Sequence, residues 1–225
     1  MTRARYTPVV NTAAHTRPTR LLLHACCGPC LLEPLDALAV EADSVTVAFA
    51  NPNIHPAEEY QRRLATLKEY ATSAGVDVLE LPYDPESWQR AVGPLADAGP
   101  ERCRACYRLR LGMAARLAAE QGFDALATTL TVSPYQDQAA INDAGREAAR
   151  REGVAWLDRD FRDRYRDATA RSRELGMYRQ NYCGCVYSEG EAAAERVARR
   201  AARAAEKAAG RAQAGRSQAG REPKG

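Results

Sequence analysis

Residues 20–30 read RLLLHACCGPC, a short apolar run that ends abruptly in a cluster of cysteines. The run has the length and composition of a buried strand, and a segment with helical spacing follows it through Glu41. Pro34 lies inside that segment, and we expect it to delay or kink the start of the helix. This stretch therefore predicts a strand that turns into a helix at a group of thiols.

The same alternation of strand and helix continues along the chain. Further strands are predicted at 44–50, 76–81, 124–132 and 154–157, and helices at 58–74, 85–92, 103–121 and 136–152. Strands that are nearly continuous apolar runs and alternate with helices favour a parallel sheet. We therefore predict an α/β fold, a parallel sheet with helices on both faces. Ligands in such folds bind beyond the carboxyl ends of the strands, so the cysteine-rich site is predicted to lie there.

Composition divides the chain into three parts. Hydrophobic residues make up 45% of the 225 residues, enough for a globular core, and no apolar stretch approaches the roughly 20 residues of a membrane span. We expect a flexible N-terminal extension over 1–19, a catalytic α/β domain over 20–188 and an Ala/Arg-rich tail over 189–225. The tail is predicted to be helical through about residue 209 and disordered beyond. The first twenty residues lack the apolar run of a secretory signal, and the expected location is a reducing cytoplasm.

The net charge of +3 belongs to the tail. Residues 189–225 hold nine Lys and Arg against five Glu, so the rest of the chain is close to neutral. A tail of this composition either attracts nucleic acid or is a solvated extension, and composition alone does not separate the two.

Six of the seven cysteines form close pairs, and the seventh, Cys30, lies three residues after the first pair. The pairs are Cys26–Cys27, Cys103–Cys106 and Cys183–Cys185. In a reducing compartment, paired cysteines more often bind metal or cycle between redox states than form structural disulfides. At Cys103–Cys106, two thiols on one helical turn point the same way. The helix N-terminus there, with Arg102 and Arg104, favours the thiolate that a metal needs.

Cys183-Gly184-Cys185 differs from the other pairs. The glycine allows a tight ring that could close as a strained, easily reduced disulfide, suited to passing electrons, but the two thiols could equally bind metal. The preceding segment, Tyr178-Arg179-Gln180-Asn181-Tyr182, combines aromatic and guanidinium planes that stack on bases with amides that read base edges. This combination favours a nucleoside pocket over a solvated surface.

Spacing alone leaves other interpretations open. Two cysteine pairs suffice for a closed Cys₄ zinc site, which would make the chain a zinc-stabilised RNA-binding module. Cys27-Gly28-Pro29-Cys30 between a strand and a helix is also typical of thioredoxin-like dithiol oxidoreductases, although that match covers only four residues. With three histidines in all, a histidine metal site is not expected. His24 is interpreted as a core residue and His55 as a loop residue.

Six motifs occur together and in a fixed order. They are His24-Ala-Cys-Cys-Gly-Pro-Cys30, Asn51-Pro-Asn-Ile54, Arg102-Cys-Arg-Ala-Cys-Tyr107, Thr128-Thr-Leu130 with Ser133-Pro134, Asp160-Phe-Arg162 and Gln180-Asn-Tyr-Cys-Gly-Cys-Val-Tyr-Ser188. In this combination the chain closely resembles the epoxyqueuosine reductase family of the QueH type, from about Leu21 to Ser188. The first twenty residues and the tail lie outside the resemblance.

The resemblance implies an adenine-nucleotide-hydrolase-like (HUP-like) fold and an oxidoreductase. The reaction would be the reduction of the epoxide of epoxyqueuosine in tRNA to queuosine, the last step of that modification. Relatives of this fold that use ATP carry a Gly-rich loop where this chain has cysteines, so adenylation is not expected. The implied partners are tRNA, through its epoxyqueuosine-containing anticodon loop, and an unidentified electron donor, with no membrane.

The resemblance also implies roles for the cysteines. Cys26, Cys27, Cys103 and Cys106 would bind a [4Fe–4S] cluster, and Cys183 and Cys185 would form a redox-active pair. A second iron and the role of Cys30 stay open.

Further roles are hypotheses from the chemistry. Turning an epoxide into an alkene takes two electrons and two protons, and the candidate proton donors are Asp137, Asp160 and Tyr135. Substrate contacts are predicted for Tyr135, Arg162, Arg179 and Asn181.

Overall fold

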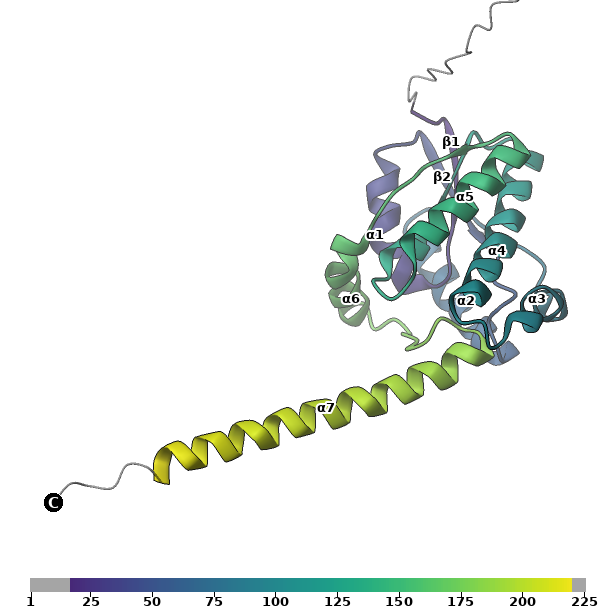
Figure 1. The fold of residues 1–225 in the computed structure, drawn as a ribbon. Coiled ribbons are helices and arrows are strands. Elements are labelled where there is room, and N and C mark those ends of the chain that lie inside the picture. The colour runs from purple at the N-terminus through teal and green to yellow at the C-terminus, as the bar shows by residue number, and fades with distance from the viewer. Residues whose placement is uncertain (1–16, 220–225) are drawn as a thin grey trace, which may run out of the picture.

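A computed structural model describes residues 17–219 of the chain, with side chains through residue 207. Five parallel strands form one sheet in the order β3-β2-β1-β4-β5 (Figure 1). The strands are β1 (Arg20–His24), β2 (Ser44–Phe49), β3 (Val78–Glu80), β4 (Ala125–Thr128) and β5 (Ala155–Trp156). The predicted parallel α/β sheet is confirmed. Its order is that of doubly wound nucleotide-binding folds, in which the direction of winding reverses beside β1.

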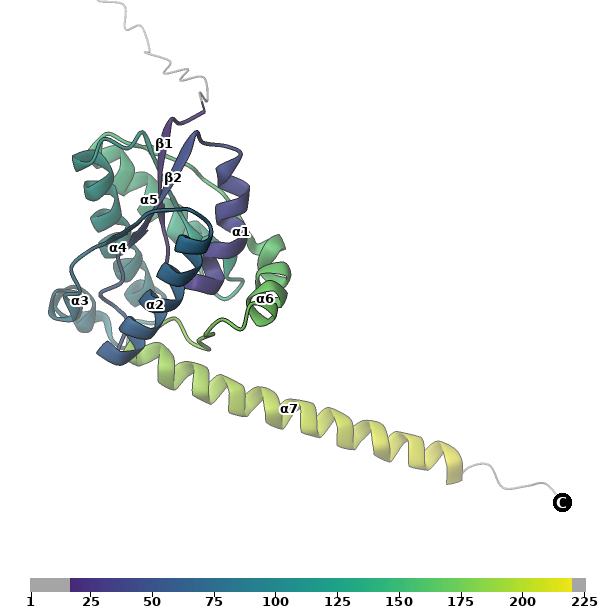
Figure 2. The same cartoon turned by 180° about the vertical axis from the view of Figure 1, so that it is seen from behind.

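Helices connect the strands and lie on both faces of the sheet (Figures 1 and 2). They are α1 (Gly28–Ala39), α2 (Ala57–Ser73), α3 (Pro85–Val92), α4 (Pro100–Glu120), α5 (Gln138–Glu152), α6 (Tyr165–Glu174) and α7 (Val186–Ala219). Short 3-10 turns occur at η1 (Gly93–Leu95), η2 (Thr129–Val132) and η3 (Arg162–Arg164). Among the described residues, no helix is long and apolar enough to cross a membrane.

The central strand β1 separates two apolar cores, because successive side chains of a strand point to opposite faces of the sheet. Leu21 and Leu23 pack with α1 and α2 in one core, and Leu22 packs with α4 and α5 in the other. All three leucines are fully buried. Burial of each contributes roughly 2 kcal/mol of transfer free energy. The unbroken apolar run in the sequence therefore reflects two covered faces.

Three predicted boundaries are wrong. The predicted strand at 124–132 ends at Thr128, because the Thr128 hydroxyl accepts a hydrogen bond from the Leu130 N–H at 3.2 Å and starts η2. The helix after β1 begins at Gly28 and continues through Pro34, so this proline does not delay it. The helix predicted from Cys103 begins at Pro100, which places Cys103 inside its first turn.

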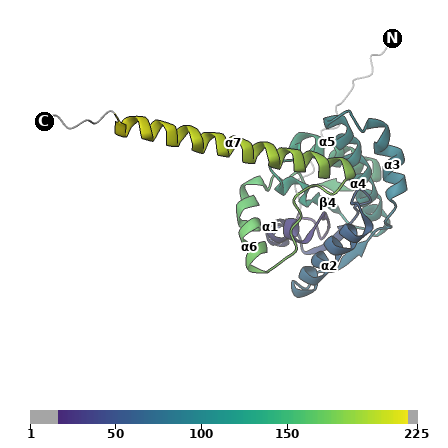
Figure 3. The ribbon, with the colours of Figure 1, turned by 90° about the horizontal axis from the view of Figure 1, so that it is seen from below.

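Two helices differ more widely from the predictions. The segment 158–182, in which no helix is predicted, contains α6, which packs against α1. The disorder predicted after residue 209 is not found as far as Ala219, where α7 ends. This helix begins beneath α3 and α4 and projects away from the domain, as the view from below also shows (Figures 1 and 3). Residues 1–16 and 220–225, which belong to the predicted extensions, lie outside the described residues.

Candidate functional site

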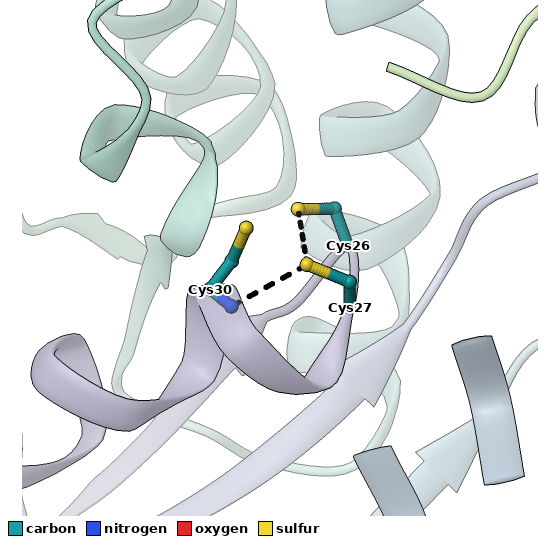
Figure 4. Close-up of side chains that lie close together, drawn as sticks. All are labelled: Cys26, Cys27 and Cys30. Carbon is teal, nitrogen blue, oxygen red and sulfur yellow. Dashed lines mark hydrogen bonds between the residues drawn. The ribbon is translucent and has the colours of Figure 1, made fainter. Parts of the chain in front are cut away.

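Three thiols converge beyond the carboxyl end of β1 (Figure 4). Cys26 and Cys27 follow the strand, Cys30 lies in the first turn of α1, and the three sulfur atoms lie within 4.8 Å of one another. In the described part of the chain, this is the one group of three or more Cys, His, Asp or Glu side chains so close together. The fold thus brings Cys30, whose role the sequence left open, into the first cysteine cluster.

The turn between β1 and α1 sets the direction of these side chains. Cys27 is extended and is the N-cap of α1: its sulfur accepts a hydrogen bond from the Cys30 N–H at 3.4 Å. The Cys26 N–H donates to the hydroxyl of Thr129 at 3.3 Å, which ties this turn to the end of the neighbouring strand β4. The sulfur of Cys26 lies 3.8 Å from that of Cys27. The thiols therefore lie at the end of β1 and the N-terminus of α1, and Thr129 ties them to the end of β4.

The three thiols do not ionise alike. Hydrogen bonds from the Cys27 and Cys30 thiols, helped by the charge of Arg110, hold the pKa of Cys26 well below its usual range. Burial raises the pKa of Cys27, and hydrogen bonding to Cys26 raises the pKa of Cys30. Cys26 is therefore the member of the cluster that ionises most readily, and a thiolate with two neighbouring thiols is a donor set for a metal ion.

Arg110 of α4 brings a buried positive charge to the site. It is 2% exposed and donates to the side-chain oxygen of Asn51, whose amide donates to the Ala25 carbonyl at 2.8 Å. Its charge lowers the pKa of Cys26 and also opposes the rise in the pKa of Cys106 that burial causes. Arg110 therefore lies within electrostatic reach of the first and second cysteine pairs.

His24 is a structural residue, as predicted. It is fully buried, and this burial lowers its pKa to about 3, so the ring is neutral. Nε2 donates to the Ala50 carbonyl at 3.3 Å, and Nδ1 accepts from the Thr128 hydroxyl at 2.8 Å. Both ring nitrogens are thus satisfied within the sheet, which leaves neither for a metal.

Cys103 and Cys106 lie on α4. Cys103 packs against the same apolar core as Cys26, whereas Cys106 packs with Cys185 and accepts a hydrogen bond from the indole N–H of Trp88 at 3.3 Å. Burial raises the pKa of both thiols. The second pair therefore contacts the surroundings of both the first and the third pair.

A buried arginine of α2 holds the turn that carries the third pair. Arg63 is 1% exposed and donates to the carbonyls of Cys183 at 3.0 Å and Tyr182 at 3.4 Å. Its Nε pairs with the buried Glu59 at 2.7 Å. The hydroxyl of Tyr178 donates to the same carboxylate at 2.7 Å. The position of the turn thus depends on an ion pair inside the protein.

Within this turn, Gly184 has a φ of +122°, which favours glycine, and an added Cβ would lie 3.0 Å from atoms of Arg63 and Ile54. The sulfur atoms of Cys183 and Cys185 lie 3.9 Å apart and are not bonded to each other. A hydrogen bond from the Cys185 thiol lowers the pKa of Cys183 to about 5, whereas the pKa of Cys185 is raised by the same contact. Cys183, the exposed member, is therefore the thiolate of the pair.

One cavity of about 460 Å³ joins the first and third cysteine motifs. Cys26, Cys30 and Cys183 all line it. Its other polar and aromatic walls include Tyr135, Gln136, Tyr165, Arg179, Gln180, Asn181 and Tyr182, together with Glu191, Glu195, Arg196 and Arg199 of α7. The volume lies in the range of small-molecule sites. Sulfur, stacking planes and amides therefore face one shared cavity that is open to solvent.

Of the predicted substrate contacts, Tyr135, Arg179 and Asn181 line this cavity, and Arg162 does not. Arg162 instead pairs with Asp160 at 2.6 Å on the surface, and this pairing lowers the pKa of Asp160. Asp160 is therefore ionised at neutral pH. Its predicted role as a proton donor, and that of Arg162 in substrate binding, gain no support from this geometry.

Asp137 also lies outside the cavity lining. Its carboxylate accepts a hydrogen bond from the Ala140 N–H at 3.0 Å as the N-cap of α5, and it lies 3.5 Å from Arg104. The structure thus gives this carboxylate a capping role, and proton donation by it stays a prediction.

Sequence reasoning missed Glu59, Arg63 and Arg110. The first two are four residues apart on α2, which is also the ordinary spacing of a surface ion pair. The available signal for Arg110 was its position one turn after Cys106, on the same face of α4.

Comparison with known proteins decides the family. The family model of epoxyqueuosine reductase QueH matches residues 21–191. This chain belongs to the QueH family. The resemblance seen in the motifs is thereby confirmed, as is the prediction that the chain is an oxidoreductase. Most of α7 lies beyond the end of the QueH match.

Curated relatives carry the same family name. The QueH protein of Streptococcus pyogenes is 39% identical over 182 residues, which cover 76% of this chain and 71% of the relative. That of Staphylococcus aureus is 35% identical over 181 residues, 75% of each chain. That of Dehalococcoides mccartyi is 35% identical over 173 residues, 76% of this chain and 93% of the relative. A solved chain described as a predicted subunit of tRNA methyltransferase from Methanocaldococcus jannaschii overlaps 68% of this chain and 76% of its own, with 12% identity and a TM-score of 0.45.

Proposed function

We propose that this QueH-family chain is a cytoplasmic enzyme that removes the epoxide oxygen of epoxyqueuosine in tRNA to give queuosine. The observation that carries the proposal is the single cavity onto which Cys26, Cys30 and Cys183 open beside stacking and amide side chains. The name of the relatives supplies the substrate. The cavity supplies thiols that can give electrons and planes that can hold a base.

The thiol set fits an iron–sulfur centre in its donor chemistry, because such clusters are held by cysteine thiolates. The fit rests on the three neighbouring sulfurs of Cys26, Cys27 and Cys30 and on the pKa of Cys26, which is well below its usual range. We assign Cys26, Cys27, Cys103 and Cys106 as ligands of a [4Fe–4S] cluster, and the place of Cys30 beside Cys26 and Cys27 makes it a candidate for an extra ligand. When bound, a cluster of this kind supplies single electrons at low potential.

The residues Cys183 and Cys185 are the proposed source of an electron pair. Removal of the epoxide oxygen breaks two C–O bonds, consumes two electrons and two protons, and releases water. Oxidation of two thiols to one disulfide releases the same two electrons and two protons. The two sulfur atoms, 3.9 Å apart, must approach to about 2 Å to bond. A reductant outside the chain then restores the dithiol.

Side chains around the cavity are proposed to hold the modified nucleoside. Tyr135 and Arg179 offer planes on which a base can stack. The side-chain oxygen of Gln180 is buried and accepts no hydrogen bond from the described residues, so it is free to accept one from a base edge. Asn181 presents a second amide to the same space.

Replacement of Cys103 or Cys106 by Ala tests the proposed ligands. Each variant is expected to lose the brown absorbance of the anaerobically purified protein and its activity on epoxyqueuosine in tRNA together, because both depend on the same thiolates. Cluster absorbance retained at the wild-type level in either variant would refute the assignment. Cys185→Ala is the matched control: it is expected to keep the absorbance and to lose turnover.

Analysis of iron, acid-labile sulfide and zinc in the anaerobic protein separates the proposal from its alternatives. Iron with sulfide supports the reductase. Stoichiometric zinc without sulfide would instead favour a zinc-stabilised RNA-binding module, and disulfide reduction by the metal-free protein would favour a thioredoxin-like enzyme.

A further inference from the structure

From its start to residue 207, the helix α7 gathers its positive charges on one side. Five basic residues follow one another at intervals of one to four residues, so that all five fall on one face of the helix. They are Arg196, Arg199, Arg200, Arg203 and Lys207, which we call the basic stripe. The opposite face carries alanine at 194, 198, 201 and 205. A helix that only needs to stay solvated has no reason to place its cations on one side.

The basic stripe starts at the cavity. Arg196 and Arg199 line the cavity wall. The other three residues of the stripe come later in α7, the helix that projects from the domain (Figure 1). From Arg196 to Lys207 it spans about 16 Å at the rise of an α-helix. The stripe is thus continuous with the space in which the proposed reaction takes place.

Contacts near the cavity fix the direction in which the stripe leaves. Glu191, in the second turn of α7, pairs with the buried Arg102 of α4 at 2.6 Å. Arg196 donates to the carbonyl of Asn181, itself a cavity residue, at 3.2 Å. The N-terminal part of α7 is therefore held by α4 and by the segment around Asn181, which also contribute to the site.

The outer part of the stripe is available to a partner. Arg200, Arg203 and Lys207 are exposed and make no ion pair or hydrogen bond with the rest of the described chain. Unpaired cations in a row are a surface for a polyanion, and phosphate contacts of this kind position a nucleic acid without reading its sequence. An anionic lipid surface would instead need large apolar side chains opposite the cations, where α7 has alanine.

We propose that the basic stripe of α7 binds the phosphate backbone of the tRNA whose modified nucleoside enters the cavity. This inference rests on the proposed function, and it assigns an RNA-docking role to a part of the chain outside the QueH match. The stripe would hold the RNA next to the cavity mouth, while the cavity side chains would hold the nucleoside itself.

The test compares two full-length variants with the wild type. In the neutral variant, Arg200→Gln, Arg203→Gln and Lys207→Gln remove three charges outside the cavity and keep residues of good helix propensity. In the relocated variant, the three positions become Ala while Ala198→Arg, Ala201→Arg and Ala205→Lys restore the same net charge on the opposite face. Fluorescence anisotropy with labelled tRNA measures Kd as a function of salt, and turnover of epoxyqueuosine in tRNA gives KM and kcat.

Both variants are expected to raise Kd and KM for tRNA roughly tenfold or more at low salt, with kcat unchanged. The slope of log Kd against log salt should fall by about two to three, the value expected for three lost phosphate contacts. If the neutral variant has the wild-type Kd, KM and salt slope, the proposal that the basic stripe binds tRNA is refuted. Full recovery of tRNA affinity in the relocated variant would also overturn it, since total charge and not its position would then matter.

The two proposals fail separately. If the wild type does not reduce epoxyqueuosine but the neutral variant still loses tRNA affinity, the reaction is wrong and the stripe stands. If the wild type reduces the substrate and the neutral variant loses affinity only for phosphatidylserine vesicles, the stripe binds lipid and the RNA proposal is overturned.

Discussion

At Cys183 a thiol, not a cation, provides the main stabilisation of the thiolate. The hydrogen bond from Cys185 lowers the pKa of Cys183 to about 5, so its thiolate is present above that pH and is lost as the pH falls through it. We expect alkylation of Cys183 by iodoacetamide to be nearly constant from about pH 6 upward, whereas an ordinary thiol speeds up to about pH 8.5. Peptide mapping by mass spectrometry after timed alkylation measures this rate for Cys183 alone.

The variant Cys185→Ala supplies the control for this prediction. Without the donated hydrogen bond, the pKa of Cys183 rises, and alkylation at pH 6 is expected to fall roughly tenfold or more. An unchanged pH profile in the variant would show that another group stabilises the thiolate.

Among the elements, α2 acts on the site through its buried ion pair. Arg63→Met leaves the buried Glu59 carboxylate without its positive partner, with the Tyr178 hydroxyl still donating to it, and we expect a loss of about 3 to 5 kcal/mol of stability in urea unfolding. It also removes the donors to the carbonyls of Tyr182 and Cys183. Turnover should therefore fall as well.

The double variant Glu59→Leu with Arg63→Met separates these two effects. Replacing both charges by apolar groups is expected to restore most of the stability, because no uncompensated charge remains. Turnover should stay low, because nothing replaces the hydrogen bonds to the turn. Wild-type kcat in the double variant would show that Arg63 matters for stability only.

The turn itself gives a further prediction. Gly184→Ala places a Cβ at positive φ, 3.0 Å from Arg63 and Ile54, and is expected to cost about 1 to 3 kcal/mol and to lower turnover. Gly75→Ala is the matched control, since Gly75 also has positive φ but no atom within 4 Å of the added Cβ. It should cost about 1 kcal/mol and leave turnover unchanged. Equal effects of the two substitutions on turnover would contradict the steric argument.

How far the sequence predicts each element depends on what holds it. The strand β1 could be predicted because its leucines fill two apolar cores. The helix α6 could not, because only Ala168 and Ser172 of it are buried and it has no apolar face to detect. It is held by charge instead, for example between Arg171 and both Glu33 and Asp36 of α1.

The same reasoning applies to the site. The thiols of Cys26 and Cys27 could be placed, because a residue that follows a parallel strand lies at the carboxyl edge of the sheet. The burial of Arg63 and Arg110 could not be predicted. Apolar periodicity indicates which hydrophobic residues face the core, but it does not indicate which charged side chains are buried beside them. Both arginines are buried because backbone carbonyls or polar side chains meet them there.

For the whole molecule, α7 is expected to contribute to stability only near its start. A chain that ends at Arg199 should keep the wild-type Tm, because the removed side chains from Arg200 to Lys207 are all exposed. A chain that ends at Gly190 loses Glu191, leaves Arg102 buried without its partner, and should lose about 4 to 10 °C. Thermal unfolding by circular dichroism measures both.

The substitution Glu191→Gln in the full-length chain checks the cause. It should lower Tm in the same direction as the shorter truncation, since it removes the charge that faces Arg102 and nothing else. A lower Tm in the chain that ends at Arg199 would contradict this division of α7.

The three leucines of β1 leave the register of this strand against its neighbours to be fixed by another residue. Leucine side chains of β1 fill the apolar cores on both faces of the sheet. If β1 shifted by one residue against its neighbours, leucines would still fill both cores, so hydrophobicity alone does not fix the register of this strand. The slip would, however, detach His24 from Ala50 and Thr128, which it can reach in one alignment only. The hydrogen bonds of His24 therefore fix the register of β1 in the sheet, and with it the positions of the Cys26 and Cys27 sulfur atoms.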